Sequence, residues 1–242
     1  MTDRPAMFHN KDDARQYVWD TMQSQKIARF PFPPHHRIPN FAGAEEAANQ
    51  LMRHPLVQSA GKIKVNPDAP QRYVRLKALE QGITVYMPTP RLRSGFTRLN
   101  PEKIPESQYS QAASLSKGQR FQEHVPLDQL PQMDLIVAGS VAVTNSGKRC
   151  GKGHGYSDLE YAILRELGHD AVPVATTVHR IQVVDDFPGD AHDVPLSVIV
   201  TPADTIDVET PPAPSGIDWE LLSNEDVDAM PILKELFHSS RE

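Results

Sequence analysis

The sequence predicts an α/β fold in which a mostly parallel sheet is flanked by helices. Strand-like apolar segments alternate with helix-like amphipathic segments between residues 62 and 200. Strands that are separated by helices pair in parallel, because the helix carries the chain back to the edge from which it started. The segment DLIVAG at 134–139 is apolar almost throughout, which is typical of a strand that is buried on both faces.

The first expected element is an amphipathic helix over 11–25, whose apolar residues recur at spacings of three and four. The prolines in the segment RFPFPP at 29–34 end this helix, because proline lacks an amide hydrogen and restricts the residue before it. The polar, turn-rich stretch 100–131 predicts loops and short helices. The remaining expected elements are a loop over 35–41, a helix over 42–51, a strand over 62–65, a helix over 71–81, strands over 83–88 and 134–139, a helix over 159–167, and strands over 171–175 and 196–200.

We expect one α/β domain over 1–209, followed by a spacer and a tail over 210–242. The spacer TPPAPSG at 210–216 is rich in proline and therefore stiff. Too many apolar residues follow it for a solvated end, so the tail is expected to pack on the domain or on a partner subunit of a homo-oligomer. These residues are Trp219, Leu221, Leu222, Ile232, Leu233, Leu236 and Phe237.

Composition limits the class of protein. The 25 Lys and Arg residues against 31 Asp and Glu give a formal net charge of −6, which argues against general coating of nucleic acid. No RNP-type aromatic pattern is present, so no nucleic-acid partner is expected. No apolar run has the length of a membrane span and the N-terminus does not resemble a signal peptide, so we expect a cytoplasmic protein without a membrane partner. One cysteine, Cys150, excludes an internal disulfide.

The strongest local signal is the segment SGKRCGKGHGYSD at 146–158, which joins an expected strand to an expected helix. Glycines allow the backbone to approach a ligand closely, and the amides at a helix N-terminus favour an anion. Arg149 and Lys152 add positive charge beside these amides. The segment therefore predicts a phosphate-binding loop, although glycine loops of this kind also serve packing alone.

The full pattern, Arg149-x-Gly-x-Gly-x-Gly-Tyr-x-Asp158, resembles the signature of the 5-formyltetrahydrofolate cyclo-ligase (methenyltetrahydrofolate synthetase) family. The pair Lys11-x-x-x-Arg15 resembles the N-terminal ATP-binding element of that family. The segment 187–202 resembles its Pro-x-x-x-His-Asp…Val-Thr ending, and Asp193 follows Asp158 by 35 positions, as the metal-binding aspartates of the family do. The resemblance spans residues 11–202.

The resemblance implies a NagB/RpiA/CoA-transferase-like fold and a ligase that uses ATP and Mg²⁺. The reaction converts 5-formyltetrahydrofolate to 5,10-methenyltetrahydrofolate with release of ADP and phosphate. By position, Lys11 and Arg15 hold ATP phosphates, and Asp158 and Asp193 hold magnesium. The loop that surrounds the phosphates and the formyl group comprises Arg149, Gly151, Lys152, Gly153, His154, Gly155 and Tyr156, and its catalytic members are Arg149, Lys152 and Tyr156.

Several of these residues also have a purely structural interpretation. Lys11 and Arg15 can form a solvated helix face, and Asp158 can cap a helix that begins at Leu159. The pair His192-Asp193 can be a turn before a strand. Cys150 has no catalytic partner in the sequence, although its basic neighbours would lower the pKa of its thiol.

The substrate segment departs from typical members of the family. The residues NPDAPQR at 66–72 stand where typical members carry a Glu-x-x-Thr segment that contacts folate, and only Asp68 resembles that glutamate. The segments 35–41 and 89–93, the segment around His179 and the tail at Trp219 resemble a divergent branch of the family. This branch is that of the animal methenyltetrahydrofolate synthetase domain-containing proteins. Arg91 and Arg93 follow an expected strand end, where α/β sheets tend to bind ligands, so with His36 they are candidates for a second site for an anionic substrate. The alternative is that the arginines pair with surface acids and the histidine fills a loop. Three hypotheses therefore remain: a folate cyclo-ligase, an ATP-dependent enzyme for another anionic metabolite, and a non-enzymatic regulator that binds nucleotide or folate.

Overall fold

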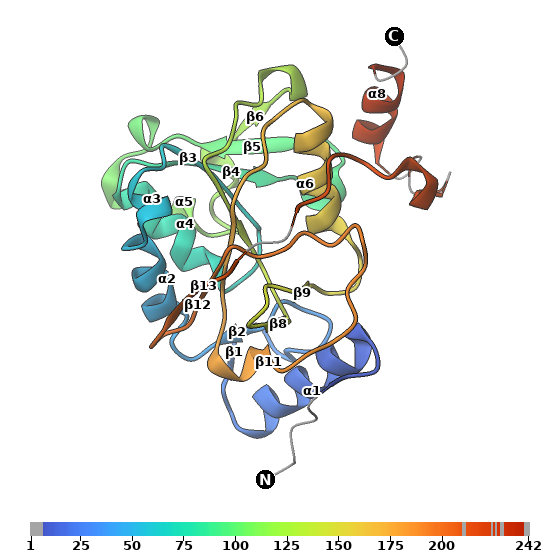
Figure 1. Cartoon of the computed structure of the whole chain (residues 1–242). Coiled ribbons are helices and arrows are strands. Elements are labelled where there is room, and N and C mark those ends of the chain that lie inside the picture. The colour runs from blue at the N-terminus through green and yellow to red at the C-terminus, as the bar shows by residue number, and fades with distance from the viewer. Residues whose placement is uncertain (1–6, 210–211, 224, 226, 228–229, 240–242) are drawn as a thin grey trace.

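The computed structural model describes residues 7–209, 212–223, 225, 227 and 230–239. Its main sheet has eight strands: β3 (Lys62–Val65), β4 (Thr84–Pro88), β5 (Phe96–Leu99), β6 (Glu123–Val125), β7 (Leu135–Ala138), β10 (Val174–Thr177), β12 (Val198–Val200) and β13 (Thr205–Asp207). The strand order is β13-β12-β10-β7-β3-β4-β5-β6 (Figure 1). The five central strands pair in parallel, whereas β13 at one edge and β5 and β6 at the other pair antiparallel. The predicted α/β fold with a mostly parallel sheet is confirmed.

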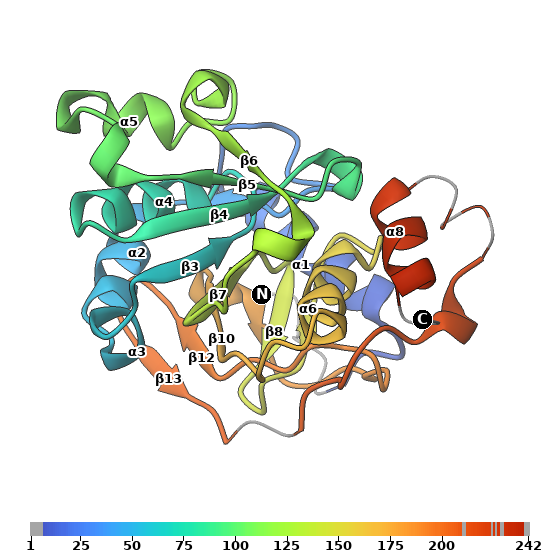
Figure 2. The ribbon, with the colours of Figure 1, turned by 90° about the horizontal axis from the view of Figure 1, so that it is seen from above.

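Helices cover both faces of this sheet, as Figure 2 shows from above. Helices α2 and α4 pack on each other and cover one face, and α6 lies against the other face. The α-helices are α1 (Lys11–Ser24), α2 (Ala44–Met52), α3 (Pro55–Gln58), α4 (Gln71–Glu80), α5 (Tyr109–Ala112), α6 (Tyr156–Glu166) and α8 (Pro231–Ser239). Among the described residues, no helix combines the length and the apolar character needed to cross a membrane.

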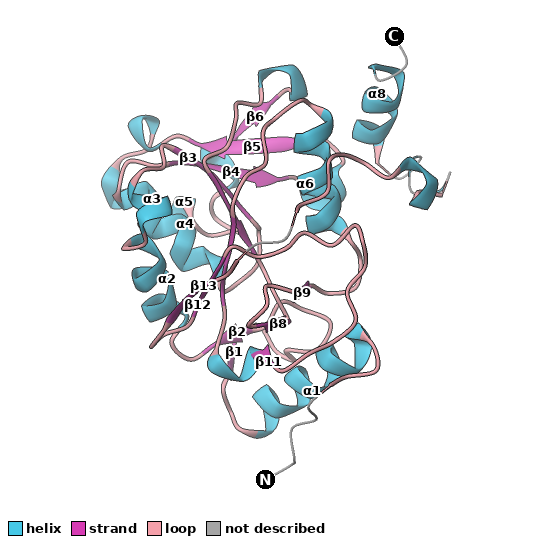
Figure 3. Ribbon diagram, in the orientation of Figure 1, coloured by secondary structure: helices cyan, strands magenta, loops and turns pink. Residues whose placement is uncertain are grey.

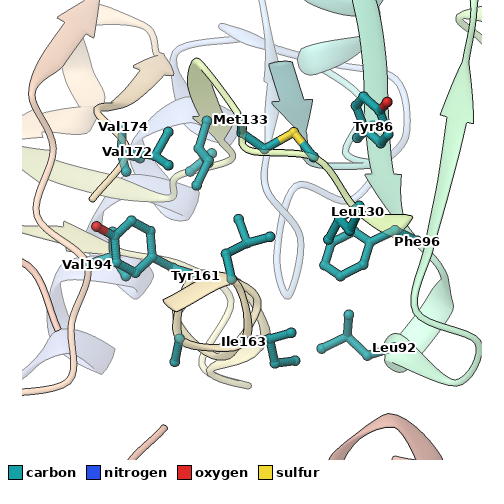
Figure 4. Packing of buried hydrophobic residues seen from close by; sticks show 14 of the residues in the cluster. Tyr86, Leu92, Phe96, Leu130, Met133, Tyr161, Ile163, Val172, Val174 and Val194 are labelled. Atoms are coloured by element: carbon teal, nitrogen blue, oxygen red, sulfur yellow. The ribbon is translucent and has the colours of Figure 1, made fainter. Parts of the chain in front are cut away.

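Strand β7 shows why the sequence forms a sheet that is buried on both faces. Successive side chains of a strand point to opposite faces. Leu135 and Val137 pack into the core beneath α2 and α4, and Ile136 and Ala138 pack into the core that contains α6. Figure 4 shows part of this second core, where Tyr161 and Ile163 of α6 lie among residues of the sheet. All four residues of β7 are at most 3% exposed, so an uninterrupted apolar run was needed here.

Helix α1 belongs to a third, smaller core beside the main sheet (Figure 3). It begins at Lys11 because the side chain of Asn10 accepts a hydrogen bond from the amide of Asp13 at 2.8 Å. Its apolar face packs against two short sheets. These are β1 (Ala28–Arg29) with β2 (Asn40–Phe41), and β8 (Ala142–Thr144) with β9 (Arg149–Cys150) and β11 (Val183–Val184).

Some boundaries differ from the sequence predictions. Helix α6 begins at Tyr156 rather than at Leu159, because Gly155 turns the chain into the helix with a φ of 66°. Strand β10 covers Val174–Thr177 rather than 171–175, since its two threonines continue the pairing with β12. The edge strands β5, β6 and β13 were not predicted. Their pairing depends on the strands beside them more than on an apolar pattern of their own.

The tail packs against the α/β domain in the described residues. Ile217, Ile232, Leu233 and Leu236 are buried in the core that contains α6, and Figure 2 shows α8 beside α6. Glu166 of α6 accepts hydrogen bonds from the amide of Ile217 at 3.1 Å and from the indole of Trp219 at 3.4 Å. Leu221 remains 59% exposed. The side chain of Phe237 and residues 210–211 lie outside the described part of the chain.

Candidate active site

A cavity of about 460 Å³ opens at the carboxyl ends of β3 and β4. This is the edge of a parallel sheet at which α/β proteins bind ligands. Its walls come from the segments that follow β3 and β4, the first turn of α1, the glycine loop that leads into α6, and residues 190–193. Lys11, Arg15, Asp68, Asp158 and Asp193 line it together with all seven predicted loop residues from Arg149 to Tyr156.

Arg15 is not part of a solvated helix face. Its side chain is 10% exposed and crosses from α1 to the glycine loop, where Nε donates a hydrogen bond to the carbonyl of Gly151 at 2.6 Å. Asp12 accepts a second hydrogen bond from the guanidinium at 2.5 Å. The guanidinium also lies under Gly153, where a Cβ atom would come within 3.5 Å of it. Arg15 therefore ties α1 to the loop and places a positive charge beneath it.

The glycine loop needs its glycines for backbone conformation. Gly153 and Gly155 have φ angles of 101° and 66°, in the left-handed region that side chains disfavour. Because Gly155 is the N-cap, no side chain caps α6. The first amides of α6 therefore face a cavity that is lined with cations, an arrangement that binds phosphate groups well.

Asp158 does not cap α6, since it lies in the first turn of that helix. Its Oδ1 accepts hydrogen bonds from Arg149 Nη2 at 2.8 Å and from the amide of Val194 at 3.1 Å. Burial alone would raise the pKa of Asp158, but the charge and hydrogen bond of Arg149 and the amide of Val194 lower it overall. Burial likewise opposes the charge of Arg149, and Asp158 outweighs this effect and raises the pKa of the guanidinium. The pair is ionised and joins β9 to α6.

Lys11 lies between two carboxylates of the segment 190–193. Its ammonium donates hydrogen bonds to Asp190 Oδ2 and Asp193 Oδ1, both at 2.6 Å. Burial lowers the pKa of Lys11, but the bonds and charges of the two aspartates outweigh burial and raise it. Asp193 Oδ2 also accepts a hydrogen bond from the amide of Asp190 at 2.7 Å, so the turn predicted for these residues exists alongside the ion pair.

The same segment offers donor atoms for a divalent cation. Asp190, His192 and Asp193 form a group whose ligand atoms lie within 4.8 Å of one another, and all three line the cavity. Carboxylate oxygens with retained water are the usual ligands of Mg²⁺. The donor set therefore fits magnesium at Asp190 and Asp193. Asp158 is not a member of this group, and its Oδ1 is already bonded to Arg149.

Cys150 lines the cavity but is only 2% exposed. Its basic neighbours do not lower the pKa of the thiol as the sequence suggested. Burial raises that pKa and outweighs the opposing charges of Arg15, Arg149 and Lys11. The thiol is therefore protonated and unreactive at neutral pH.

The floor of the cavity contains charged residues that the sequence analysis missed. Lys64 of β3 and Glu160 of α6 form a buried ion pair, with side chains that are 1% and 5% exposed. Asn66 contacts both residues, and it lines the cavity with Glu160. Burial raises the pKa of Glu160, and the ammonium of Lys64 opposes this rise. The sequence signal was weak, because Lys64 stands beside Lys62 in the alternating segment Lys-Ile-Lys-Val and only its burial distinguishes it.

The candidate substrate residues divide into two groups. Asp68 lines the cavity and accepts a hydrogen bond from Lys152 Nζ at 3.2 Å. His36 packs instead on Trp19, with 5.4 Å between the ring centroids, and Arg93 is exposed beside a second, smaller pocket. Neither is among the described residues that line the main cavity. The side chain of Arg91 lies outside the described part. The structure therefore does not bring His36 and Arg93 together with the phosphate loop.

Known proteins match this chain over most of its length. The sequence profile of the 5-formyltetrahydrofolate cyclo-ligase family matches residues 13–202. The chain belongs to this family. The matched range includes the whole glycine loop and the acidic segment 190–193 that line the cavity.

The curated relatives include methenyltetrahydrofolate synthase domain-containing proteins. The chain is 42% identical to the protein of Bos taurus over 96% of its own length, and 43% identical to that of Mus musculus over 94%. It spans 63% of the length of each of these relatives. A 5-formyltetrahydrofolate cyclo-ligase of Mycolicibacterium smegmatis is 31% identical over 32% of this chain and 38% of its own length.

A solved structure shows the same fold. The 5,10-methenyltetrahydrofolate synthetase of Aquifex aeolicus has a TM-score of 0.53 with 16% identity, and the match covers 86% of this chain and 98% of that one. At this identity the likeness concerns the fold alone. It agrees with the central sheet and flanking helices described above.

Proposed function

We propose that this protein is an ATP- and Mg²⁺-dependent enzyme that converts 5-formyltetrahydrofolate to 5,10-methenyltetrahydrofolate. ADP and phosphate are the other products, and the formyl oxygen leaves with the phosphate. The observation that supports this proposal most strongly is the cavity itself. It combines Lys11, Arg15 and Lys152 with the uncapped N-terminus of α6 and with the carboxylates of residues 190–193.

In this proposal the residues of the chain position ATP and neutralise its charge. Phosphoryl transfer depends mainly on positioning and charge neutralisation, and the cavity provides cations and backbone amides for both. Lys152 and the loop amides hold the γ-phosphate, while Arg15 supports the loop from below. Asp190 and Asp193 would hold magnesium in place of Lys11, and the metal would supply further positive charge to the phosphates.

Arg149 and Asp158 have an indirect part in the proposal. Both line the cavity, and Arg149 Nε is buried without a partner in the described residues. The guanidinium donates to the carbonyl of Gly139 at 3.0 Å as well as to Asp158, so it fixes the end of β7 against α6. Their role is to hold the phosphate loop and the segment around Val194 in place.

The test is the absorbance of methenyltetrahydrofolate after the purified chain is mixed with 5-formyltetrahydrofolate, ATP and Mg²⁺. A typical cyclo-ligase is the positive control, and Lys152→Met is the variant expected to lose most of the activity. Lys117→Met, at an exposed position that does not line the cavity, is the matched control. Absence of turnover in the wild-type chain, with ATP still bound, would favour another substrate or a regulatory role.

A further inference from the structure

The floor of the cavity is a polar network built from β3, α6 and the segment between β3 and α4. It consists of Lys64, Asn66, Ser157 and Glu160, which we call the floor network. Lys64 Nζ donates to Asn66 Oδ1 at 3.0 Å and also to Glu160 Oε2. Asn66 Nδ2 donates to Ser157 Oγ at 2.8 Å and to Glu160 Oε2 at 3.4 Å. Every hydrogen bond that Glu160 receives from the described residues therefore reaches Oε2.

The other carboxylate oxygen of Glu160 is available to a ligand. Glu160, Asn66 and Ser157 all line the cavity, whereas Lys64 lies behind them. Lys64 and Asn66 hold the carboxylate through Oε2, so Oε1 is a fixed hydrogen-bond acceptor at the bottom of the cavity. A fixed acceptor of this kind binds an N–H or O–H group without reorganisation.

Fold stability alone does not explain this arrangement. Replacing a buried ion pair by apolar residues of similar size is often neutral or stabilising. The chain nevertheless places a second buried cation behind the same segment. Arg75 is 1% exposed and donates to the carbonyls of Asn66 at 2.8 Å and Asp68 at 3.3 Å. Two buried cations thus hold the segment that follows β3 in a defined position beside the cavity.

The floor network adjoins the phosphate-binding groups, because Ser157 belongs to the first turn of α6. Arg15, Lys152 and the loop amides supply positive charge to the lining of the cavity, and Glu160 supplies a buried acceptor. Two ligands can therefore share the cavity: one places a phosphate group near the loop, and the other places a ring with N–H groups at Glu160. The segment that includes Asn66 is also where the sequence departs from the folate-contacting Glu-x-x-Thr of typical family members.

We propose that Glu160 binds a ring N–H group of the pteridine end of folate, and that Lys64 and Asn66 are positioning residues for Glu160. This inference rests on the proposed function, because it takes folate as the ligand. The pteridine ring carries amino and amide N–H groups that require acceptors when buried. A site built around such a hydrogen bond rejects analogues that lack the donor.

The test is calorimetric binding of 5-formyltetrahydrofolate to the full chain without ATP. Glu160→Gln is the main variant. Because Lys64 continues to donate to this side chain, the glutamine amide turns its oxygen to Lys64 and presents its NH₂ group to the ligand. We expect the folate Kd to rise at least tenfold while the Kd for ATP stays unchanged. Glu106→Gln, at an exposed position away from the cavity, is the control.

A second variant separates ligand binding from folding. The double substitution Lys64→Met and Glu160→Leu removes both charges, so it is expected to leave thermal stability equal or higher and to weaken folate binding at least tenfold. If Glu160→Gln or the double variant folds and binds folate with unchanged affinity, the inference is overturned. It is also overturned if the wild-type chain does not bind 5-formyltetrahydrofolate. Binding that depends on Glu160, without turnover, would contradict the proposed function and leave this inference intact.

Discussion

Arg149 and Asp158 form a buried ion pair of 2.8 Å beside the glycine loop. The side chain of Arg149 is 2% exposed and that of Asp158 is 16% exposed. Arg149 lies in β9 and Asp158 in the first turn of α6, so the pair connects the two ends of the glycine loop. The signature residues of the family are therefore held together by charge before any nucleotide binds.

The first prediction concerns the stability of this pair. Arg149→Met leaves Asp158 as a buried, unpaired charge, which is expected to lower the free energy of unfolding by about 3–5 kcal/mol. Urea denaturation measures the loss. The neighbouring Lys148→Met breaks a partly exposed pair with Asp186 and should cost less than about 1 kcal/mol. Equal losses in the two variants would contradict a structural role for the Arg149–Asp158 pair.

The second prediction concerns ATP affinity. Lys152 lines the cavity and is 37% exposed, so Lys152→Ala removes a phosphate-binding charge without opening the core. We expect the Kd for ATP to rise roughly tenfold, equivalent to about 1.4 kcal/mol, with a smaller effect at high salt. Calorimetry at two ionic strengths measures this, and Lys117→Ala is the exposed control. Equal ATP affinity in the two variants would place the phosphates elsewhere.

The third prediction concerns magnesium. Asp193→Asn keeps one oxygen, which can still accept the hydrogen bond from the amide of Asp190 that holds the turn, and it removes a charge from the metal ligands. We expect the Mg²⁺ concentration for half-maximal activity to rise several-fold, with thermal stability close to that of the wild type. Titration of Mg²⁺ in the absorbance assay measures it, with Asp186→Asn as the control. Unfolding without a change in metal requirement would show that Asp193 serves only its turn.

The fourth prediction concerns the tail. Leu233 of α8 is 0% exposed, and its neighbour Ile232 lies 3.3 Å from a Cβ placed on Gly95, in the turn between β4 and β5. Leu233→Ala is expected to destabilise the protein by about 2–5 kcal/mol because it leaves a cavity in the core. Leu221→Ala, at a position that is 59% exposed, should change stability by less than about 0.5 kcal/mol. Chemical denaturation of both variants decides whether the tail is part of the folded domain.

The fifth prediction concerns pH. His179 caps a short helical turn by accepting a hydrogen bond from the amide of Ile181 at 3.2 Å, and burial lowers the pKa of its imidazole below 6.5. The unfolded chain therefore binds the proton more readily than the folded one. The stability that neutral His179 contributes is present above pH 6.5 and is lost as the pH falls through the folded-state pKa.

A matched variant isolates this effect. Asparagine is a good N-cap and does not titrate, so His179→Asn should keep the cap and reduce the loss of stability between pH 7 and pH 5. Thermal unfolding of the two proteins across this range gives the comparison. A steeper decline in the variant than in the wild type would contradict the assigned direction of the pKa shift.

Local patterns in the sequence were sufficient for the central elements and for the position of the glycine loop. The apolar run at 134–139 predicted a strand that is buried on both faces, and β7 has this property. The glycines and cations of 149–156 are neighbours in the sequence, so the sequence alone places them close together, and all of them line the cavity. The edge strand β5 did not follow, because its pairing with β4 depends on a neighbouring strand rather than on a local pattern.

The sequence by itself determined the central strands and the helices between them, the family and the loop that holds the signature residues. Only the tertiary structure decided which distant side chains meet. It paired Lys64 with Glu160 and Lys11 with Asp193 across 96 and 182 positions, and it separated His36 from the cavity. The physical reason is that periodicity and local spacing report on one element at a time. The partner of a buried charge is set by how the parallel strands and the helices on their two faces pack together.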